Sequence, residues 1–236
     1  MTATSERLQA VKSRLREAET KSGRAPESVA LVAVSKTQPA QAIREAYAAG
    51  QGAFGENYLQ EALEKMASLA DLPLEWHFIG PIQSNKTRPI AESFSWVHGV
   101  DRLKIAQRLS DSRPDNLPPL NICIEVNVSG EESKGGVEPV EVPVLAEAVA
   151  RLPRLKFRGL MAIPAPTNDI ALQRQQFRML RELWESLKQR GLEPDTLSMG
   201  MSEDFPAAIA EGATIVRIGT AIFGPRQKRQ PINDLS

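Results

Sequence analysis

The sequence has few of the residues that build metal sites or disulfides. Among its 236 residues there is one cysteine, Cys123, and there are two histidines, His77 and His98. A single cysteine cannot form an internal disulfide, and these residues supply neither a cysteine cluster nor a three-histidine zinc site. A mixed site with carboxylates stays open but nothing in the sequence favours it, so we expect no metal. Cys123 lies in an apolar run, where a free cysteine is usually buried, so we expect it to pack in the core.

The chain also lacks net charge and long apolar stretches. Lys and Arg number 29, as do Asp and Glu, which gives a formal charge of zero and a pI near 6.8. This balance removes the sequence-wide electrostatic case for binding nucleic acid or an anionic membrane. No stretch approaches the ~20 apolar residues of a membrane span, and residues 1–24 lack the apolar core of a signal peptide. We therefore expect a soluble, cytoplasmic protein.

Short apolar runs alternate with longer amphipathic stretches from end to end. The runs that predict strands are 29–34, 53–55, 75–79, 95–98, 120–128, 155–163, 196–199 and 214–218. A helical pattern follows each run, and an amphipathic helix within 1–24 precedes the first. Strands alternating with helices imply a parallel sheet, and eight such units in about 200 residues fit one closed (β/α)8 barrel. We predict a single domain over 1–236 with a polar tail at 225–236. An open doubly wound sheet is the alternative.

Barrel enzymes place their chemistry just after the strands. Lys36 follows the first run directly, where a neutral amine could attack a carbonyl and form a Schiff base, or where a lysine could extend into water. Asn57 follows the second run and suits orienting a ring substituent, or a turn. His77 lies within the third run and could face the barrel interior. There it would either line a ligand site or be a core histidine whose hydrogen bonds are satisfied within the protein. Lys86 opens the next helix, as a second lysine candidate or a surface residue.

The loops after the seventh and eighth runs look suited to phosphate, which barrels often bind there. Gly200 would allow close backbone approach, and Ser202 could donate its hydroxyl or merely cap the next helix. Gly219 and Thr220 could present backbone N–H groups and a hydroxyl to the same anion. Both loops carry suitable groups at the positions where barrels bind phosphate, which favours a phosphate site over a simple helix cap.

Arg217 lies two residues before Gly219 and therefore points to the same face of its strand. An inward arginine needs an acceptor, which a pyridine nitrogen or a carboxylate would supply. The alternative is a salt bridge to an inward acidic residue such as Glu125. Together with Lys36 and the phosphate loops, Arg217 predicts a pyridoxal-phosphate site.

Five ordered segments carry a resemblance to a known family. They are Val32-Ala33-Val34-Ser35-Lys36-Thr37, Phe54-Gly55-Glu56-Asn57, Trp76-His77-Phe78-Ile79-Gly80 with Gln83-Ser84-Asn85-Lys86, Ser198-Met199-Gly200-Met201-Ser202 and Val216-Arg217-Ile218-Gly219-Thr220. In these segments the sequence resembles the pyridoxal-phosphate homeostasis protein family, also called the proline-synthetase co-transcribed homologues. The resemblance runs from about Leu8 to Phe223 and implies a barrel like the N-terminal domain of alanine racemase.

The resemblance also implies roles. It makes Lys36 the Schiff-base lysine and implies that the other cofactor-binding residues are Ser202, Gly219 and Thr220 at the phosphate, Arg217 at the pyridine nitrogen, Asn57 near the ring, and His77, Ser198 and Met201 lining the pocket. It further implies a protein that buffers pyridoxal 5'-phosphate in the cell and supplies it to apo-enzymes, without an assigned reaction.

A weak amino-acid racemase or lyase is the alternative to a carrier. Racemisation needs a base on each face of the substrate, and Lys36 would be one. In alanine racemase the other is a tyrosine from a second domain, which we do not expect here, and Tyr47 and Tyr58 fall on predicted helices. We therefore favour a non-catalytic carrier that is mostly monomeric. A barrel that binds another sugar or nucleotide phosphate is a third possibility.

Overall fold

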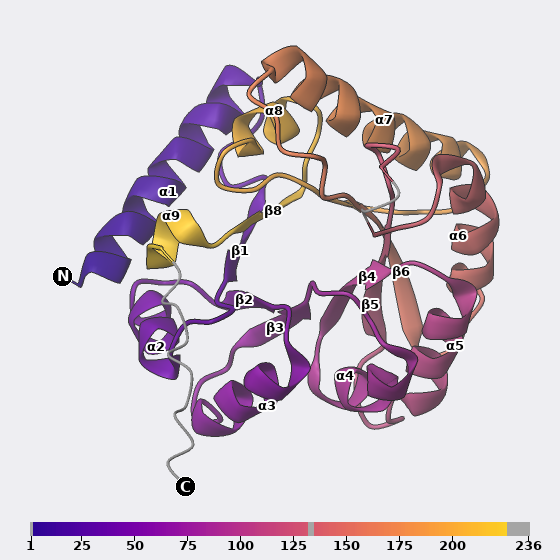
Figure 1. Cartoon of the computed structure of the whole chain (residues 1–236), viewed down its shortest axis with the longest axis horizontal. Coiled ribbons are helices and arrows are strands. Elements are labelled where there is room, and N and C mark those ends of the chain that lie inside the picture. The colour runs from indigo at the N-terminus through magenta and orange to yellow at the C-terminus, as the bar shows by residue number, and fades with distance from the viewer. Residues whose placement is uncertain (1, 132–134, 226–236) are drawn as a thin grey trace, which may run out of the picture.

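Eight parallel strands close into a barrel in which each strand pairs with its neighbours in sequence order (Figure 1). The computed structural model describes residues 2–131 and 135–225, so the predicted tail lies outside the described residues apart from Pro225. The strands are β1 Ala30–Val34, β2 Ala53–Glu56, β3 Glu75–Phe78, β4 Trp96–Val100, β5 Leu120–Glu125, β6 Leu155–Met161, β7 Thr196–Ser198 and β8 Ile215–Ile218. Strand β1 also pairs with β8, so the barrel prediction is confirmed and the open sheet is excluded.

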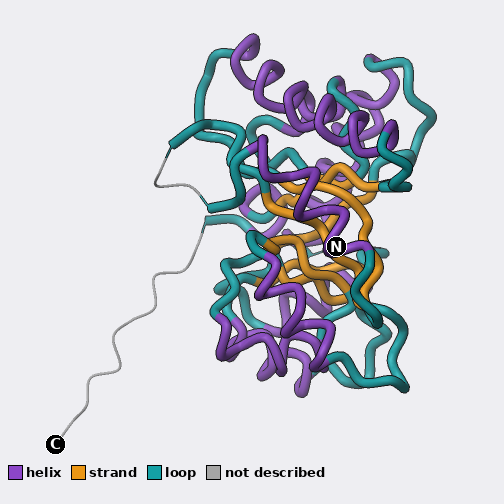
Figure 2. Tube along the Cα trace, turned by 90° about the vertical axis from the view of Figure 1, so that its right-hand side faces the viewer, coloured by secondary structure: helices purple, strands orange, loops and turns teal. Residues whose placement is uncertain are grey.

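Helices form the outer layer around the strands, as the side view in Figure 2 shows. They are α1 Ala3–Lys21, α2 Ala40–Ala48, α3 Leu59–Ser68, α4 Thr87–Ser93, α5 Leu103–Ser112, α6 Val142–Ala150, α7 Ile170–Gln189, α8 Phe205–Ala210 and α9 Thr220–Phe223, with short 3-10 turns η1 Ser84–Lys86 and η2 Pro139–Glu141. The predicted N-terminal helix is α1, which packs against α2, α8 and α9. Among the described helices, none has both the length and the apolar composition needed to cross a membrane.

The long apolar run 120–128 predicts a longer strand than the structure contains. Strand β5 ends at Glu125, because Val126 bridges to Val137 on the returning loop instead of extending the sheet. The N–H of Val126 still donates to the Met161 carbonyl oxygen at 2.8 Å. The β-branched residues after Glu125 therefore stay buried without forming a ladder.

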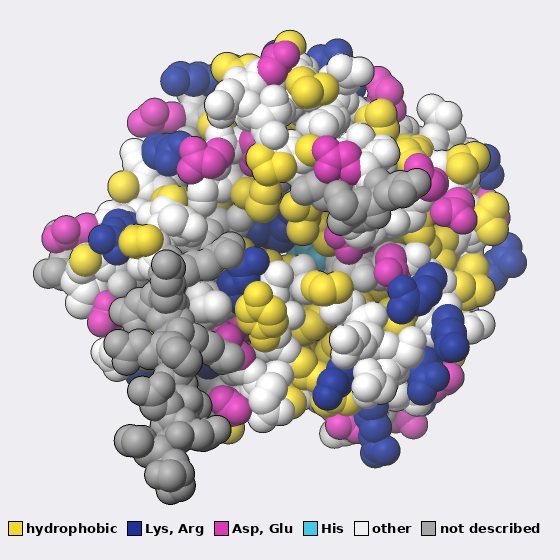
Figure 3. All heavy atoms as spheres, viewed as in Figure 1, with side chains coloured by type: hydrophobic (Ala, Val, Ile, Leu, Met, Phe, Trp, Pro, Cys, Tyr) yellow, Lys and Arg dark blue, Asp and Glu magenta, His cyan; other side chains and the backbone are white. Residues whose placement is uncertain are grey.

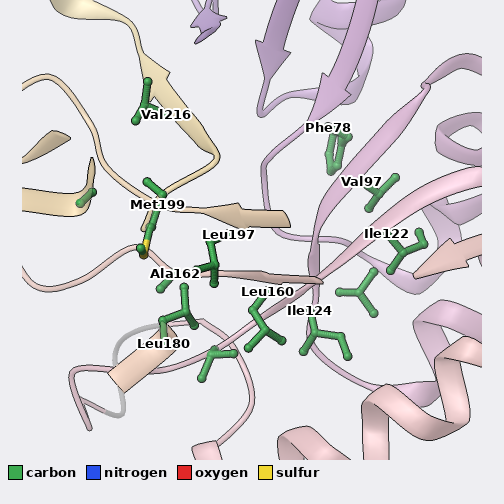
Figure 4. Packing of buried hydrophobic residues seen from close by; sticks show 14 of the residues in the cluster. Phe78, Val97, Ile122, Ile124, Leu160, Ala162, Leu180, Leu197, Met199 and Val216 are labelled. Carbon is green, nitrogen blue, oxygen red and sulfur yellow. The ribbon is translucent and has the colours of Figure 1, made fainter. Parts of the chain in front are cut away.

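Alternation along the strands divides the buried side chains between two cores. Residues such as Val97, Ile122 and Leu160 point outward and pack under the helices (Figure 4). Residues that point inward form a smaller apolar cluster of Val32, Trp96, Cys123, Met161 and Ile215. Cys123 is fully buried in that cluster, as predicted, and burial raises the pKa of its thiol to about 12.

Gly80 follows β3 and lies against the backbone of Asn57. A Cβ atom at Gly80 would collide with the Asn57 carbonyl oxygen and lie 2.8 Å from its Cα atom. We expect Gly80→Ala to lower the free energy of unfolding by about 2 kcal/mol, because the Asn57 backbone must move to admit the methyl group. Urea denaturation measures this change. Gly52→Ala is the matched control, because a Cβ atom there would meet nothing within 4 Å, and equal stability of the two variants would contradict the expectation.

Candidate functional site

A cavity of about 400 Å³ opens at the face of the barrel where the carboxyl ends of the strands emerge. Figure 3 looks onto this face, and Lys or Arg side chains and a His side chain are visible near its centre. Seven of the nine predicted cofactor-binding residues line the cavity: Lys36, Asn57, Met201, Ser202, Arg217, Gly219 and Thr220. Lys86 is exposed on η1 and does not line the cavity.

Lys36 is carried by a turn that directly follows β1. The N–H of Gln38 donates to the Ser35 carbonyl oxygen at 3.0 Å, so Lys36 and Thr37 are the two central residues of this turn. Thr37 has a φ of 64°, a left-handed conformation that is a genuine outlier for a β-branched residue. Its N–H donates to Glu61 Oε1 at 2.5 Å, which holds the strained conformation in place. The turn directs the half-buried Lys36 side chain into the cavity.

A buried charge cluster supports this turn from below. Lys65 Nζ donates to Glu56 Oε1 at 2.8 Å and to Glu61 Oε1 at 2.6 Å. It also donates to the Ser35 carbonyl oxygen at 2.7 Å, and the Ser35 hydroxyl donates to Glu56 Oε1 at 2.6 Å. Burial raises the pKa of Glu56, while the Lys65 charge opposes that shift. The cluster therefore holds the backbone on both sides of Lys36.

The sequence analysis gave neither Glu56 nor Lys65 a role. One local signal was present, because Glu61 and Lys65 are four residues apart on α3 and lie on the same helix face. That Lys65 is buried between α3 and the strands, and that Glu56 points toward it, depends on how α3 packs against the strands. The long-range contacts were therefore outside what the local pattern predicts.

The loop after β7 differs from its prediction in two respects. Helix α8 begins at Phe205 with Asp204 as its N-cap, so the alternative that Ser202 only caps the helix is wrong. Instead, Ser202 lines the cavity, and Asp204 Oδ1 accepts the N–H of Met201 at 2.6 Å. Gly200 does not line the cavity: its φ is 97°, and a Cβ atom there would lie 2.7 Å from the Cβ of Ala208 on α8. Gly200 thus admits the helix rather than a ligand.

Arg217 lies at the floor of the cavity with only 3% of its surface exposed. Its Nη1 donates to Ser198 Oγ at 2.6 Å and its Nη2 to the Ala162 carbonyl oxygen at 2.9 Å. The alternative of a salt bridge to Glu125 is wrong, because the two side chains form no ion pair, although the Glu125 charge raises the pKa of Arg217 from a distance. Burial lowers the pKa of Arg217 to about 10, which still leaves the guanidinium charged at neutral pH.

His77 and Ser198 do not line the cavity and lie deeper in the barrel. His77 is 2% exposed and donates or accepts hydrogen bonds at both ring nitrogens, as the satisfied core histidine of the alternative interpretation would. Ser198 is fully buried and joins Arg217 to His98, whose Nδ1 lies 2.8 Å from Ser198 Oγ. His98 was missed. The available signal was its spacing of two from Trp96, which places both side chains on the inward face of β4.

Comparisons with known proteins show what the whole chain is similar to. The family model described as "Alanine racemase, N-terminal domain" matches residues 7–227. A "Pyridoxal phosphate homeostasis protein" of Pseudomonas aeruginosa is 64% identical over 231 residues, which cover 98% of this chain and 99% of the relative. The Escherichia coli K12 protein of the same name is 54% identical over 222 residues, which cover 93% and 95% of the two chains. The structure of PipY from Synechococcus elongatus with PLP bound is 40% identical, with a TM-score of 0.82 over 94% of this chain and all of that one.

Glu125 is expected to make stability depend on pH. Burial raises the pKa of Glu125 from 4.5 to about 7, while the Arg217 charge opposes the shift. Between these two values the folded protein keeps the proton that the unfolded chain loses, so stability falls as pH rises and stays lower above pH 7. Glutamine cannot ionise, so Glu125→Gln should not lose this stability as pH rises. We therefore expect the wild type to lose about 3 kcal/mol more unfolding free energy than Glu125→Gln between pH 4 and pH 8. Urea denaturation at both pH values measures the difference, and a difference independent of pH would contradict it.

Proposed function

The chain belongs to the pyridoxal phosphate homeostasis proteins, which are built on the alanine racemase N-terminal domain, and on this premise we propose that it is a non-catalytic carrier of pyridoxal 5'-phosphate (PLP). The carrier holds PLP in the cavity as a Schiff base on Lys36, buffers it and supplies it to apo-enzymes. One observation supports this most strongly. Seven residues predicted from separate segments, between Lys36 and Thr220, converge on a single cavity.

The cavity offers a partner for each polar group of PLP. Ser202, Gly219 and Thr220 line one part of it and suit the phosphate, which the loops after the last two strands of a barrel often bind. Asn57 Oδ1 is buried without a hydrogen-bond partner among the described residues, and it can accept a hydrogen bond from the ring hydroxyl. An orphaned acceptor in a cavity wall is the feature expected of a residue that completes its hydrogen bonding with a ligand.

Lys36 supplies the covalent attachment. PLP supplies an aldehyde, which a lysine amine attacks with loss of water to give a Schiff base. The role of the protein is to hold the amine at the cavity wall, and the strained turn at Thr37 with the Lys65 cluster beneath it does this. Attachment at a fixed turn limits the orientations of the ring to those that reach Asn57 and Arg217.

Arg217 favours retention of the cofactor over chemistry on it. A charged guanidinium donates to the pyridine nitrogen and leaves that nitrogen unprotonated, which weakens the ring as an electron sink compared with a carboxylate partner. Burial lowers the pKa of Arg217 only to about 10, so its donors remain in place at neutral pH. This choice of partner supports a carrier.

The composition of the cavity wall also supports a carrier. Of the described residues that line it, two are basic, Lys36 and Arg217, and both are assigned to PLP. No further cation in this described wall is left to bind the carboxylate of an amino acid. Tyr58 is 55% exposed, and it does not line the cavity. The alternative, a weak racemase or lyase, would depend on the carboxylate of Glu203 or Asp204 as a second base, since both line the cavity.

Reduction of the bound cofactor tests the attachment site. We expect PLP added to the purified protein to give a visible absorption band, and borohydride to fix the label on the peptide that contains Lys36. Lys36→Ala should lose the band and the label, because the amine that forms the bond is gone. Lys86→Ala is the matched control and should keep both, since Lys86 is exposed and outside the cavity.

Three outcomes would oppose the proposal. Label on Lys86 alone would place the attachment elsewhere. The absence of a band in the wild-type protein would mean that the cavity serves another phosphate ligand. Interconversion of D- and L-amino acids well above the rate with free PLP would replace the carrier with the racemase alternative.

Comparison of PLP with pyridoxal, which lacks the phosphate, tests the phosphate loops. We expect Ser202→Ala to weaken PLP binding about tenfold or more, because a hydrogen bond to a charged group is worth about 1.5–3 kcal/mol. Pyridoxal binding should be unchanged. Ser186→Ala on α7 is the control, because its hydroxyl donates only to the Leu183 carbonyl oxygen within the helix. An equal loss of both ligands would show that Ser202 does not contact the phosphate.

A further inference from the structure

Five side chains form one continuous hydrogen-bonded chain through the barrel interior. Glu75 Oε1 lies 2.9 Å from His77 Nε2, and His77 Nδ1 lies 2.9 Å from His98 Nε2. His98 Nδ1 lies 2.8 Å from Ser198 Oγ, which accepts from Arg217 Nη1 at 2.6 Å. The members come from β3, β4, β7 and β8, so the chain crosses the barrel as well as running along it. We call it the interior chain.

The interior chain connects the two ends of the barrel. Glu75 is the first residue of β3, at the amino end of the strand, and its side chain is 52% exposed. Arg217 lines the cavity at the opposite end, and the three side chains between them are at most 2% exposed. Four inward side chains beside it are apolar, so much of this polar chain runs through an apolar interior: Val32, Cys123, Met161 and Ile215.

The direction of the hydrogen bonds follows from its two ends. An ionised Glu75 can only accept, so His77 Nε2 must carry the proton. A neutral His77 then accepts at Nδ1, which requires His98 to donate from Nε2. His98 therefore accepts at Nδ1 from the Ser198 hydroxyl, and Ser198 Oγ accepts from Arg217, which can only donate. Every donor points away from the cavity, from the Arg217 cation toward the Glu75 anion.

The environment keeps both histidines neutral, as this direction requires. Burial lowers the pKa of His77, although Glu75 opposes the shift. Burial lowers the pKa of His98 further, well below its usual value, and the Arg217 charge acts in the same direction. The hydrogen bond from His77 lowers the pKa of Glu75, which keeps the anchor ionised. Trp96 stacks on His77 with ring centroids 5.4 Å apart and 10° between the planes, so the ring is held sterically as well.

We propose that the interior chain positions the Arg217 guanidinium for the cofactor, with His77 and His98 as positioning residues and Glu75 as the anchor at the far end. This rests on the proposed function, in which Arg217 faces the pyridine nitrogen of PLP. Arg217 has no carboxylate within ion-pair distance among the described residues, and its partners are a hydroxyl and a carbonyl oxygen. The nearest carboxylate joined to it by hydrogen bonds is Glu75, four side chains away. Hydrogen bonds in such a chain polarise one another in a low-dielectric interior, so a change at Glu75 alters the acceptor strength of Ser198.

The first experiment reads the direction of the chain without activity or cofactor. The protein has only two histidines, so 15N-histidine labelling reports His77 and His98 alone, in protein free of a histidine tag. We expect the ring-nitrogen NMR spectrum at neutral pH to show two neutral imidazoles, each with its proton on Nε2. A proton on Nδ1 of either ring, or a charged ring, would overturn the proposal.

The second experiment tests whether the far end acts on the cofactor. Glu75→Gln keeps the shape of the anchor, but its amide can donate as well as accept and so no longer enforces one direction. We expect it to weaken PLP binding about two- to tenfold, the equivalent of one hydrogen bond, to shift the absorption band of the bound cofactor, and to mix the histidine tautomers. Ser198→Ala should weaken binding similarly. Glu92→Gln is the matched control, because Glu92 is also a partly exposed, paired carboxylate, 2.8 Å from Arg88 and outside the chain.

The outcomes separate this proposal from the proposed function. The control Glu92→Gln should leave PLP affinity and the absorption band unchanged. If Glu75→Gln also left both unchanged and altered only stability, the interior chain would be structural only and the proposal would fail. If the wild-type protein bound no PLP, both the proposed function and the role of the interior chain toward the cofactor would fail. The histidine tautomers would still decide the direction of the hydrogen bonds, because that experiment needs no cofactor.

Discussion

The pairing of β1 with β8 is the constraint on which the site depends. Ala30 to Ala33 pair in register with Ile215 to Ile218, although about 180 residues separate the two strands. Because parallel strands in register end together, this pairing brings the turn that carries Lys36 beside the loop of Gly219 and Thr220. The covalent attachment point and the phosphate loops therefore lie at opposite ends of the sequence and on the same side of the barrel. Closure of the sheet assembles the cavity.

Two buried cations near the cavity are satisfied in different ways. Lys65 is enclosed by Glu56 and Glu61 and has its charge balanced within its own cluster. Arg217 donates its hydrogen bonds to neutral acceptors at Ser198 and Ala162, and the carboxylates of Glu125 and Asp204 act on it only through their charges, without an ion pair. The first arrangement stabilises a backbone turn, whereas the second leaves an electrostatic field directed into the cavity. The same barrel thus separates a structural cation from one available to a ligand.

The sequence was sufficient for the barrel and for seven of the described residues that line the cavity, because both depend on local patterns. Apolar runs mark the strands, and residues just after them must emerge at one face. What the sequence could not predict is the depth of each inward side chain, which depends on the register between strands. His77 and Ser198 point inward as expected but lie one layer below the cavity, beneath Arg217. His98, Glu56 and Lys65 were missed because their partners are distant in sequence. The N-cap position of α8 is Asp204, two residues after Ser202, a local difference in the helix boundary that the sequence pattern does not resolve.

The position of α1 has a consequence for the order of events during synthesis. This helix packs against α2, which follows the first strand, and against α8 and α9, which flank the last one. On a ribosome, the first two hundred residues therefore emerge with one edge of the sheet unpaired and with α1 lacking much of its packing surface. Domains emerge from the amino terminus onward, and contacts between distant segments form late. The two walls of the cavity meet only when the last strand of the barrel is released, so a nascent chain has no complete binding site until β8 has emerged.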